Sequence, residues 1–245
     1  MSIPYRQVRA RYTADTVTVY QAYSAEIAGP ALAAGRFVPP FKPDRMTWIK
    51  PSFLWMMYRC GWGSKPGQER VLAVDITRAG LEWALSHACL SHYDRDLYAD
   101  RATWEQRMRA CPVRVQWDPE RSLRLGPGPA SPGLRSAGSA ATGARREGEA
   151  EIAPGPARAE RAPFGTAPLE HRSLQVGLGG EAATRYVDEW IVGLTDVTEL
   201  AHRVRDLVRA GDEDAARAAL PAERPYPLPA EVAATIGVVP NQDGR

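Results

Sequence analysis

Arginine, tyrosine and glutamine side chains gather near the start of the chain, in a segment that reads as a strand rich in β-branched residues. Arg9 and Arg11 share one face of an extended backbone, where two guanidinium groups could bind phosphate. Tyr20 and Tyr23 offer flat rings that could stack on a base, and Gln21 lies between them. The same pattern is also typical of a strand at the edge of the core with solvated arginines.

A second set of polar residues lies where a buried helix is predicted to begin. Lys50 and Ser52 flank Pro51, and the residues that follow to about position 60 are apolar on almost every side. The unpaired N–H groups of a helix start favour an anion, so Lys50 and Ser52 are candidates for phosphate binding. In the alternative, Ser52 caps the helix and Lys50 is solvated.

The third set lies late in the chain. Arg172 and Gln175 fall on a predicted strand and are candidates for ligand binding, while Glu189 precedes Trp190 on a predicted helix. A carboxylate beside a tryptophan can be partly desolvated, which would perturb its pKa and suit it to catalysis. The alternative is an ordinary acid on a helix surface.

Several common sites have no support in the sequence. Dinucleotide-binding and P-loop glycine patterns are absent, and no G-x-S-x-G motif is present. His87, Cys89 and His92 lack a second pair of ligands at zinc spacing, so we expect no metal site.

The composition is typical of a soluble globular protein, with 245 residues, 44% of them hydrophobic and 24% charged. The longest apolar run, 53–58, is far below the roughly 20 residues of a membrane span, and no signal peptide is visible. The 3 cysteines show no C-x-x-C spacing. We therefore expect a cytoplasmic protein that does not bind membranes. The sequence predicts no particular oligomeric state.

Charge is distributed unevenly, although the formal net charge is only +2. Basic side chains outnumber acidic ones in residues 1–70, and the reverse holds in residues 169–245. The two ends could neutralise each other in the fold, or the N-terminal part could bind a small anion, a nucleotide or nucleic acid.

Hydrophobic periodicity predicts an α+β fold, with mixed sheets of at least five strands around a buried helix. We expect one domain over 5–220, interrupted at 126–168 by a disordered insertion rich in Gly, Pro and Ala, and a peripheral Pro-rich tail over 221–245. The predicted strands cover 15–21, 47–50, 70–77, 113–117 and 172–178. The predicted helices cover 24–35, 51–60, 78–88, 103–110, 181–190 and 198–209, with Thr103 and Thr198 as N-caps of their helices.

Long strings of the chain resemble the family catalogued as Domain of Unknown Function 4291. They are RARYTADTVTVYQAYS (9–24), PPFKPDRMTWIKPSFLWMMYR (39–59), GQERVLAVDITRAGLEWAL (67–85), VRVQWDPER (113–121) and RSLQVGLGGEAATRYVDEWIVGLTDVT (172–198). The resemblance spans most of residues 5–205 outside the insertion. It implies membership of the family and no particular mechanism.

A looser resemblance is to the ADP-ribosyltransferase superfamily, whose members bind NAD in a cleft between two small sheets. It implies catalytic roles for Arg11, Tyr23 and Glu189, with Glu189 stabilising an oxocarbenium ion. Gln21 stands where that superfamily would have a strand arginine, and no Glu-x-Glu or Gln-x-Glu precedes a late strand.

Three hypotheses follow, in order of preference. The first is a transferase that uses NAD or another nucleotide, with glycosyl or ADP-ribosyl transfer as the reaction. The second is a module that binds single-stranded nucleic acid through basic and aromatic side chains. The third is a non-enzymatic scaffold, in which the tryptophan-rich strings only reflect core packing.

Overall fold

The structure combines helices with three β-sheets, which confirms the predicted α+β class. It is a computed structural model that describes residues 3–123 and 166–238. One antiparallel sheet contains, in spatial order, β2 (Thr16–Tyr23), β4 (Arg70–Thr77) and β8 (Ile191–Asp196). A mixed sheet contains β3 (Thr47–Ile49), β7 (Thr166–Leu178), β6 (Val113–Leu123) and β5 (Ala88–Leu90), with β5 and β6 parallel. The short β1 (Arg9–Ala10) and β9 (Arg224–Pro225) pair with each other.

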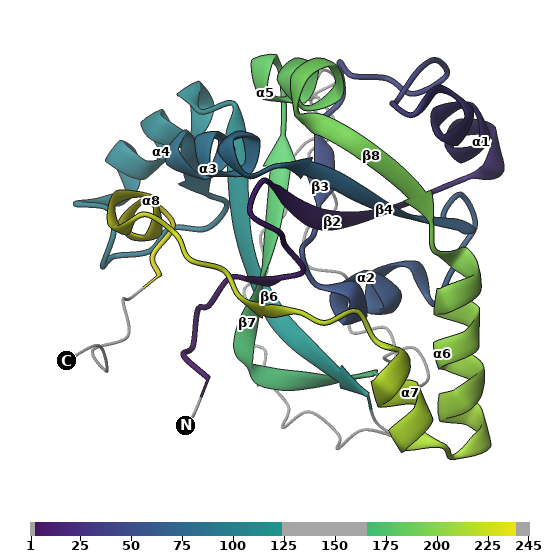
Figure 1. The fold of residues 1–245 in the computed structure, drawn as a ribbon. Helices are drawn as coiled ribbons and strands as arrows, with labels where there is room; N and C mark the ends of the chain where they lie inside the picture. Colours follow the sequence, from purple (N-terminus) through teal and green to yellow (C-terminus); the bar gives the residue numbers. More distant parts are fainter. Residues whose placement is uncertain (1–2, 124–165, 239–245) are drawn as a thin grey trace, which may run out of the picture.

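Helices cover these sheets from several sides (Figure 1). In chain order they are α1 (Ala25–Ala34), α2 (Phe53–Cys60), α3 (Arg78–Ser86), α4 (Arg101–Ala110), α5 (Glu181–Arg185), the π-helical turn η1 (Tyr186–Trp190), α6 (Thr198–Ala210), α7 (Glu213–Ala219) and α8 (Ala230–Thr235).

Strand β2 is buried on both of its faces. Its register with β4 runs without interruption from Thr16 and Thr77 to Tyr23 and Arg70. Val17 and Val19 join the core cluster that also contains residues of α3, whereas Tyr20 joins the cluster built around α2 and α6. Because successive side chains of a strand point to opposite faces, helices on both sides bury the polar Thr18 and Gln21 as well as the valines.

Helix α2 is the buried helix that the sequence predicts, and it packs against strands of both larger sheets (Figure 1). The Ser52 hydroxyl accepts a 3.1 Å hydrogen bond from the Trp55 N–H, which caps the first turn. Gly61 ends the helix in the left-handed region at a φ of 60°. Phe53, Met56 and Met57 are buried, and this burial of apolar surface holds the helix between the sheets.

The two larger sheets meet at a single backbone contact between β2 and the residue after β3. The Tyr20 N–H donates a 2.7 Å hydrogen bond to the Lys50 carbonyl oxygen. This contact is called the seam below. It brings the side chains around Tyr20 next to those around Lys50, although Tyr20 and Lys50 lie 30 residues apart in the chain.

Two predicted caps differ from the structure. Helix α4 begins after Asp100, whose carboxylate accepts a 2.7 Å hydrogen bond from the Thr103 N–H, so Thr103 lies in the first turn rather than before it. Helix α6 begins at Thr198, but the Thr198 hydroxyl accepts from the Val71 N–H of the neighbouring strand. In both cases a nearby donor or acceptor competes with the cap that the sequence alone suggested.

The C-terminal segment packs into the main core rather than lying at its periphery. Tyr226, Val232 and Ile236 are buried, and the Trp117 indole N–H donates a 2.9 Å hydrogen bond to the Ile236 carbonyl oxygen. Residues 126–165 of the predicted insertion lie outside the described residues. Its last three residues, 166–168, belong to β7, which pairs with β6 from its first residue.

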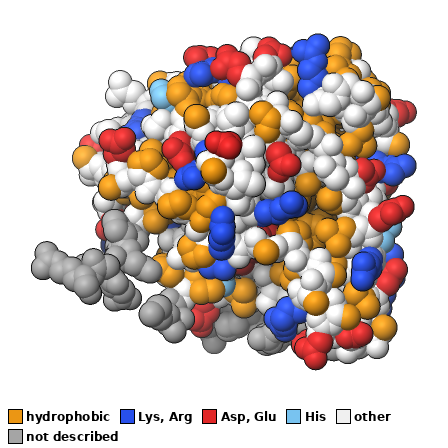
Figure 2. Space-filling view, viewed as in Figure 1, with side chains coloured by type: hydrophobic (Ala, Val, Ile, Leu, Met, Phe, Trp, Pro, Cys, Tyr) orange, Lys and Arg blue, Asp and Glu red, His pale blue; other side chains and the backbone are white. Residues whose placement is uncertain are grey.

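Charged side chains are mixed on the face that Figure 2 shows, where lysine and arginine lie among aspartate and glutamate rather than in one basic patch. Across residues 3–123 and 166–238, none of the helices combines the length and the apolar character that a membrane crossing needs.

Two helical glycines give opposite expectations for substitution by alanine. A Cβ at Gly80 in α3 would lie 2.5 Å from Trp190 Cγ, so Gly80→Ala forces the ring to move and should destabilise the fold by about 1–3 kcal/mol. A Cβ at Gly29 in α1 would meet nothing within 4 Å, so Gly29→Ala should stabilise it by up to about 1 kcal/mol. Urea unfolding of both variants measures the difference, and equal effects would contradict this packing.

Candidate functional site

A cavity of about 230 Å³ lies at the seam between the two larger sheets. Its walls come from the end of β2, from β3, from α2 and from the residues just before β4. The lining residues are Gln21, Ala22, Tyr23, Met46, Thr47, Trp48, Lys50, Met56, Arg59 and Gln68.

The Gln21 amide organises one wall of this cavity. Its Nε2 donates hydrogen bonds of 2.8 Å to the Tyr23 hydroxyl and 2.8 Å to Thr47 Oγ1, and lies 3.2 Å from the Trp48 carbonyl oxygen. Its Oε1 accepts a 2.6 Å hydrogen bond from the Tyr186 hydroxyl of η1. The Tyr186 hydroxyl donates this hydrogen bond, so its partner must be the amide oxygen of Gln21. This fixes which side of the amide carries the oxygen and which carries the nitrogen.

The Gln21 network leaves one hydroxyl donor for a ligand. The Tyr23 and Thr47 oxygens lie 3.1 Å apart, so one of their two O–H groups donates to the other. The other O–H has no acceptor within this network. Because Tyr23 and Thr47 both line the cavity, this O–H can donate to a ligand. Burial raises the pKa of Tyr23 to about 12, so its phenol keeps its proton at neutral pH.

Lys50 brings an amine to the same cavity. Its side chain is buried, with its Nζ 3.4 Å from the Trp48 carbonyl oxygen and 5.2 Å from the centre of the Trp55 ring. No described carboxylate lies within ion-pair distance of it. Burial, with the nearby Arg59 charge as a second cause, lowers the pKa of Lys50 to about 7, although Asp118 opposes this shift. A large fraction of the amine is therefore unprotonated at neutral pH.

Arg59 is the exposed cation of α2 and lines the cavity beside Lys50. Within the described part of the chain it forms no ion pair, so its five N–H donors remain for a ligand or for water. Met46 and Trp48 supply an apolar wall opposite these polar groups. A Cβ at Gly177 would lie 2.9 Å from Trp48 Cη2, so the absence of a side chain at Gly177 lets the indole lie flat against β7.

Asp118 and Gln175 extend the polar side of the mixed sheet away from the cavity. Gln175 is paired with Gln116 across β6 and β7, and its Nε2 lies 3.4 Å from both Gln116 Oε1 and Asp118 Oδ2. Burial raises the pKa of Asp118, and Lys50 acts against that rise. Asp118 is therefore the carboxyl group that interacts electrostatically with Lys50 without forming an ion pair with it.

The start of α2 is occupied by a carboxyl group of the chain itself. The Phe53 N–H donates a 2.7 Å hydrogen bond to Glu223 Oε1, and the Ser52 hydroxyl donates a 2.8 Å hydrogen bond to Glu120. Burial, with Glu120 as a further cause, raises the pKa of Glu223 to about 8. Ser52 therefore acts as the helix cap, and the C-terminal segment supplies a carboxyl oxygen, rather than an external anion, as the acceptor at this helix start.

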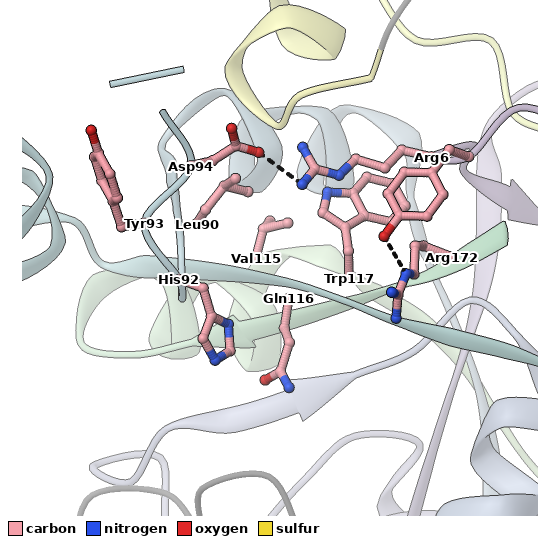
Figure 3. A pocket seen from close by; sticks show the side chains of 10 residues that line it. Arg6, Leu90, His92, Tyr93, Asp94, Val115, Gln116, Trp117 and Arg172 are labelled. Carbon is pink, nitrogen blue, oxygen red and sulfur yellow. Dashed lines mark hydrogen bonds and ion pairs between the residues drawn. The ribbon is translucent and has the colours of Figure 1, made fainter. Parts of the chain in front are cut away.

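A second cavity, of about 210 Å³, is lined by residues of β6, by the segment that follows β5, and by Tyr5, Arg6 and Arg172 (Figure 3). Arg6 pairs with Asp94 at 2.8 Å, and the Arg172 Nε donates a 2.8 Å hydrogen bond to the Tyr5 hydroxyl. Figure 3 shows Trp117 on the same side of the strand as Arg6. Arg172 thus belongs to this cavity and not to the one that Lys50 lines.

The structure brings together three of the residues that the sequence singled out. Gln21, Tyr23 and Lys50 line the same cavity, and Gln175 follows on the adjoining strand. Gln21 and Tyr23 come from β2 and Lys50 follows β3, and the seam and the hydrogen bonds to Thr47 hold these segments together.

Other sequence candidates lie elsewhere. Arg9 binds the Glu223 carbonyl oxygen at 3.1 Å, Arg11 is exposed near β1, and Tyr20 is buried in the core against Phe53. Glu189 pairs with Arg185 at 3.0 Å and its side chain is 54% exposed. None of these four side chains lines either cavity. The structure thus does not assemble Arg11, Tyr23 and Glu189 into one catalytic group.

The sequence reasoning missed Thr47, Arg59 and Tyr186. Arg59 could have been noticed as the only cation in an otherwise apolar helix, where a charge needs a particular reason. Tyr186 gave no such signal, because its role depends on a contact with Gln21, which lies 165 residues away.

Comparison with known families now adds to this geometry. A family model described as Domain of unknown function (DUF4291) matches residues 7–132 and 158–226. The chain belongs to this family. The DUF4291 match includes every residue that lines the Lys50 cavity, and it omits 133–157, which lie inside the predicted insertion. The chain matches none of the curated proteins and none of the solved structures with which it was compared.

Removal of the Tyr186 hydroxyl tests the Gln21 network. Tyr186→Phe leaves the buried Gln21 Oε1 without its donor, which should destabilise the fold by about 1–3 kcal/mol. Tyr5→Phe serves as a control, because the hydrogen bond of Tyr5 is exposed and its loss should change stability by less than about 0.5 kcal/mol. Chemical denaturation measures both, and an unchanged Tyr186→Phe variant would contradict the network.

The buried amine should also make stability depend on pH. Between pH 7 and about 10 the unfolded chain binds a proton at Lys50 that the folded chain has lost, so the free energy of unfolding should rise with pH over this range. Lys50→Met should flatten the rise, whereas Lys42→Met at an exposed position should preserve it. Urea unfolding across this range measures the slopes, and equal slopes in the two variants would show that Lys50 titrates normally.

Proposed function

We propose that the chain is a transferase that binds a small anionic, nucleotide-like ligand in the Lys50 cavity. One observation carries the proposal: Lys50 and Arg59 line the same cavity, and neither forms an ion pair with a described residue. The Arg59 guanidinium, together with the protonated fraction of Lys50, favours a ligand with a phosphate group. NAD is one candidate, and so is any other nucleotide or sugar phosphate.

The remaining walls suit the rest of such a ligand. The hydroxyl donor left by Tyr23 and Thr47 fits a sugar oxygen, and Trp48 offers an apolar surface. The volume of about 230 Å³ is below the roughly 300–1,000 Å³ of most drug-sized ligand pockets. It therefore suits the phosphate and sugar part of a nucleotide, with a base or a second phosphate extending towards solvent.

Glu189 has no part in this proposal, because its carboxylate is ion-paired at the surface. The face that Figure 2 shows mixes charges of both signs and so offers no support for nucleic-acid binding on that face. An extended strand of nucleic acid would be expected to follow a continuous basic groove.

Isothermal titration tests the ligand. NAD, ATP and ADP-ribose are titrated separately, and at least one should bind. Arg59→Ala should weaken that binding by roughly ten-fold or more, because a charge-assisted hydrogen bond is lost. Arg109→Ala removes a 76% exposed guanidinium of α4 and should leave binding unchanged.

Two outcomes would contradict the proposal. One is no binding of any of the three ligands at millimolar concentration. The other is equal weakening in Arg59→Ala and Arg109→Ala, which would point to non-specific attraction. Tight, strongly salt-dependent binding of mixed single-stranded oligonucleotides without nucleotide binding would favour the second hypothesis instead.

A further inference from the structure

The Lys50 amine has the surroundings of a nucleophile rather than those of a structural cation. A lysine that stabilises a fold normally pairs with a carboxylate or extends its ammonium group into water. Lys50 does neither: the residue is 5% exposed, and its Nζ lies 3.4 Å from the Trp48 carbonyl oxygen and 5.2 Å from the centre of the Trp55 ring. Lys50 is one of the residues that line the cavity.

Two features of the cavity keep this amine reactive. Burial disfavours the ammonium form, and the Arg59 guanidinium disfavours it further because it is a second positive charge. Asp118 and the Cys60 thiol are the groups that favour the charged form, and neither is within ion-pair or hydrogen-bond distance of Nζ. The lone pair of Nζ is thus present at neutral pH.

We propose that Lys50 forms an imine with a small phosphorylated aldehyde, such as the open-chain form of a ribose phosphate, whose phosphate binds Arg59. The inference rests on the proposed function for the phosphate site and adds a covalent step to it. It also narrows the ligand, because a nucleotide such as ADP-ribose, which carries a free ribose carbon 1, has both the phosphate and the aldehyde.

The step needs no external oxidant or reductant. The Nζ lone pair forms a bond to the aldehyde carbon, and the carbonyl oxygen takes up a proton, which the free O–H of Tyr23 or Thr47 can supply from the same cavity. The nitrogen then loses a proton that restores this donor. The hydroxyl then takes a second proton from the same donor and leaves as water while the nitrogen lone pair forms the C=N bond. The nitrogen gives up its last proton, which restores the donor. One amine and one aldehyde give one imine and one water.

The small number of lysines in the chain makes a labelled lysine easy to identify. The sequence has three lysines, Lys42, Lys50 and Lys65, so an adduct can be assigned by peptide mass without ambiguity. The probe is pyridoxal 5′-phosphate, a phosphorylated aldehyde, and sodium borohydride reduces any imine to a stable secondary amine. Pyridoxal without the phosphate is the matched probe.

At pH 7 the full-length protein should be labelled at Lys50 at least ten-fold faster than at Lys42, since an ordinary lysine is almost fully protonated at that pH. Labelling at Lys50 should be faster with pyridoxal phosphate than with pyridoxal, and Arg59→Ala should abolish this preference. ADP-ribose should slow the labelling. Lys42→Arg and Lys65→Arg should label like the unaltered chain.

The results separate the two proposals. Nucleotide binding by titration together with labelling at Lys50 no faster than at Lys42 would overturn the imine and leave the phosphate site standing. Fast labelling at Lys50 that shows no preference for the phosphorylated probe would overturn the pairing of Lys50 with Arg59. The assignment uses the unaltered chain, so it does not depend on whether Lys50→Arg folds.

Discussion

The hydrogen bond from the Tyr20 N–H to the Lys50 carbonyl oxygen is the constraint on which the candidate site depends. It joins β2 to the residue that follows β3, and these strands belong to different sheets. A backbone contact fixes the direction of the neighbouring side chains, because side chains alternate along an extended segment. Gln21 therefore faces Thr47 and Trp48, and Lys50 faces the same hollow.

Burial at this seam has different consequences for different side chains. For Gln21, burial is compensated, since its oxygen and nitrogen both have partners of 2.6–2.8 Å. For Lys50 it is not compensated by an opposite charge, and the amine changes its protonation instead. The hydrophobic packing of α2 thus stabilises the fold, and the burial that accompanies it lowers the pKa of Lys50.

Local elements could be predicted from the sequence because local patterns determine them. The β-branched residues of β2 and β4, and the apolar run that follows Pro51, placed these strands and α2 within a few residues of their observed bounds. Strand β8 and helix α8 were missed, since each is short and is held by tertiary contacts. Ile236, just beyond α8, is an example, buried against residues that lie far away in the chain.

The site was predictable only where the functional residue also had a local signal. Lys50 stood out by its place at the start of a predicted helix, and Gln21 by its place between two tyrosines on a predicted strand. Glu189 stood out because it precedes Trp190, but its helical turn directs it to Arg185 and the surface, while Tyr186 of the same turn reaches Gln21. Which face of a turn points inward depends on packing between distant segments, and one sequence does not contain that information.

The contact between Glu223 and the first turn of α2 has a consequence for biosynthesis. A ribosome delivers the chain from the N-terminus, so α2 leaves it long before residue 223 does. Until then the Phe53 N–H lacks the Glu223 carboxyl group that accepts its hydrogen bond in the complete fold. This contact can therefore form only after residue 223 has left the ribosome, when α2 has long been synthesised.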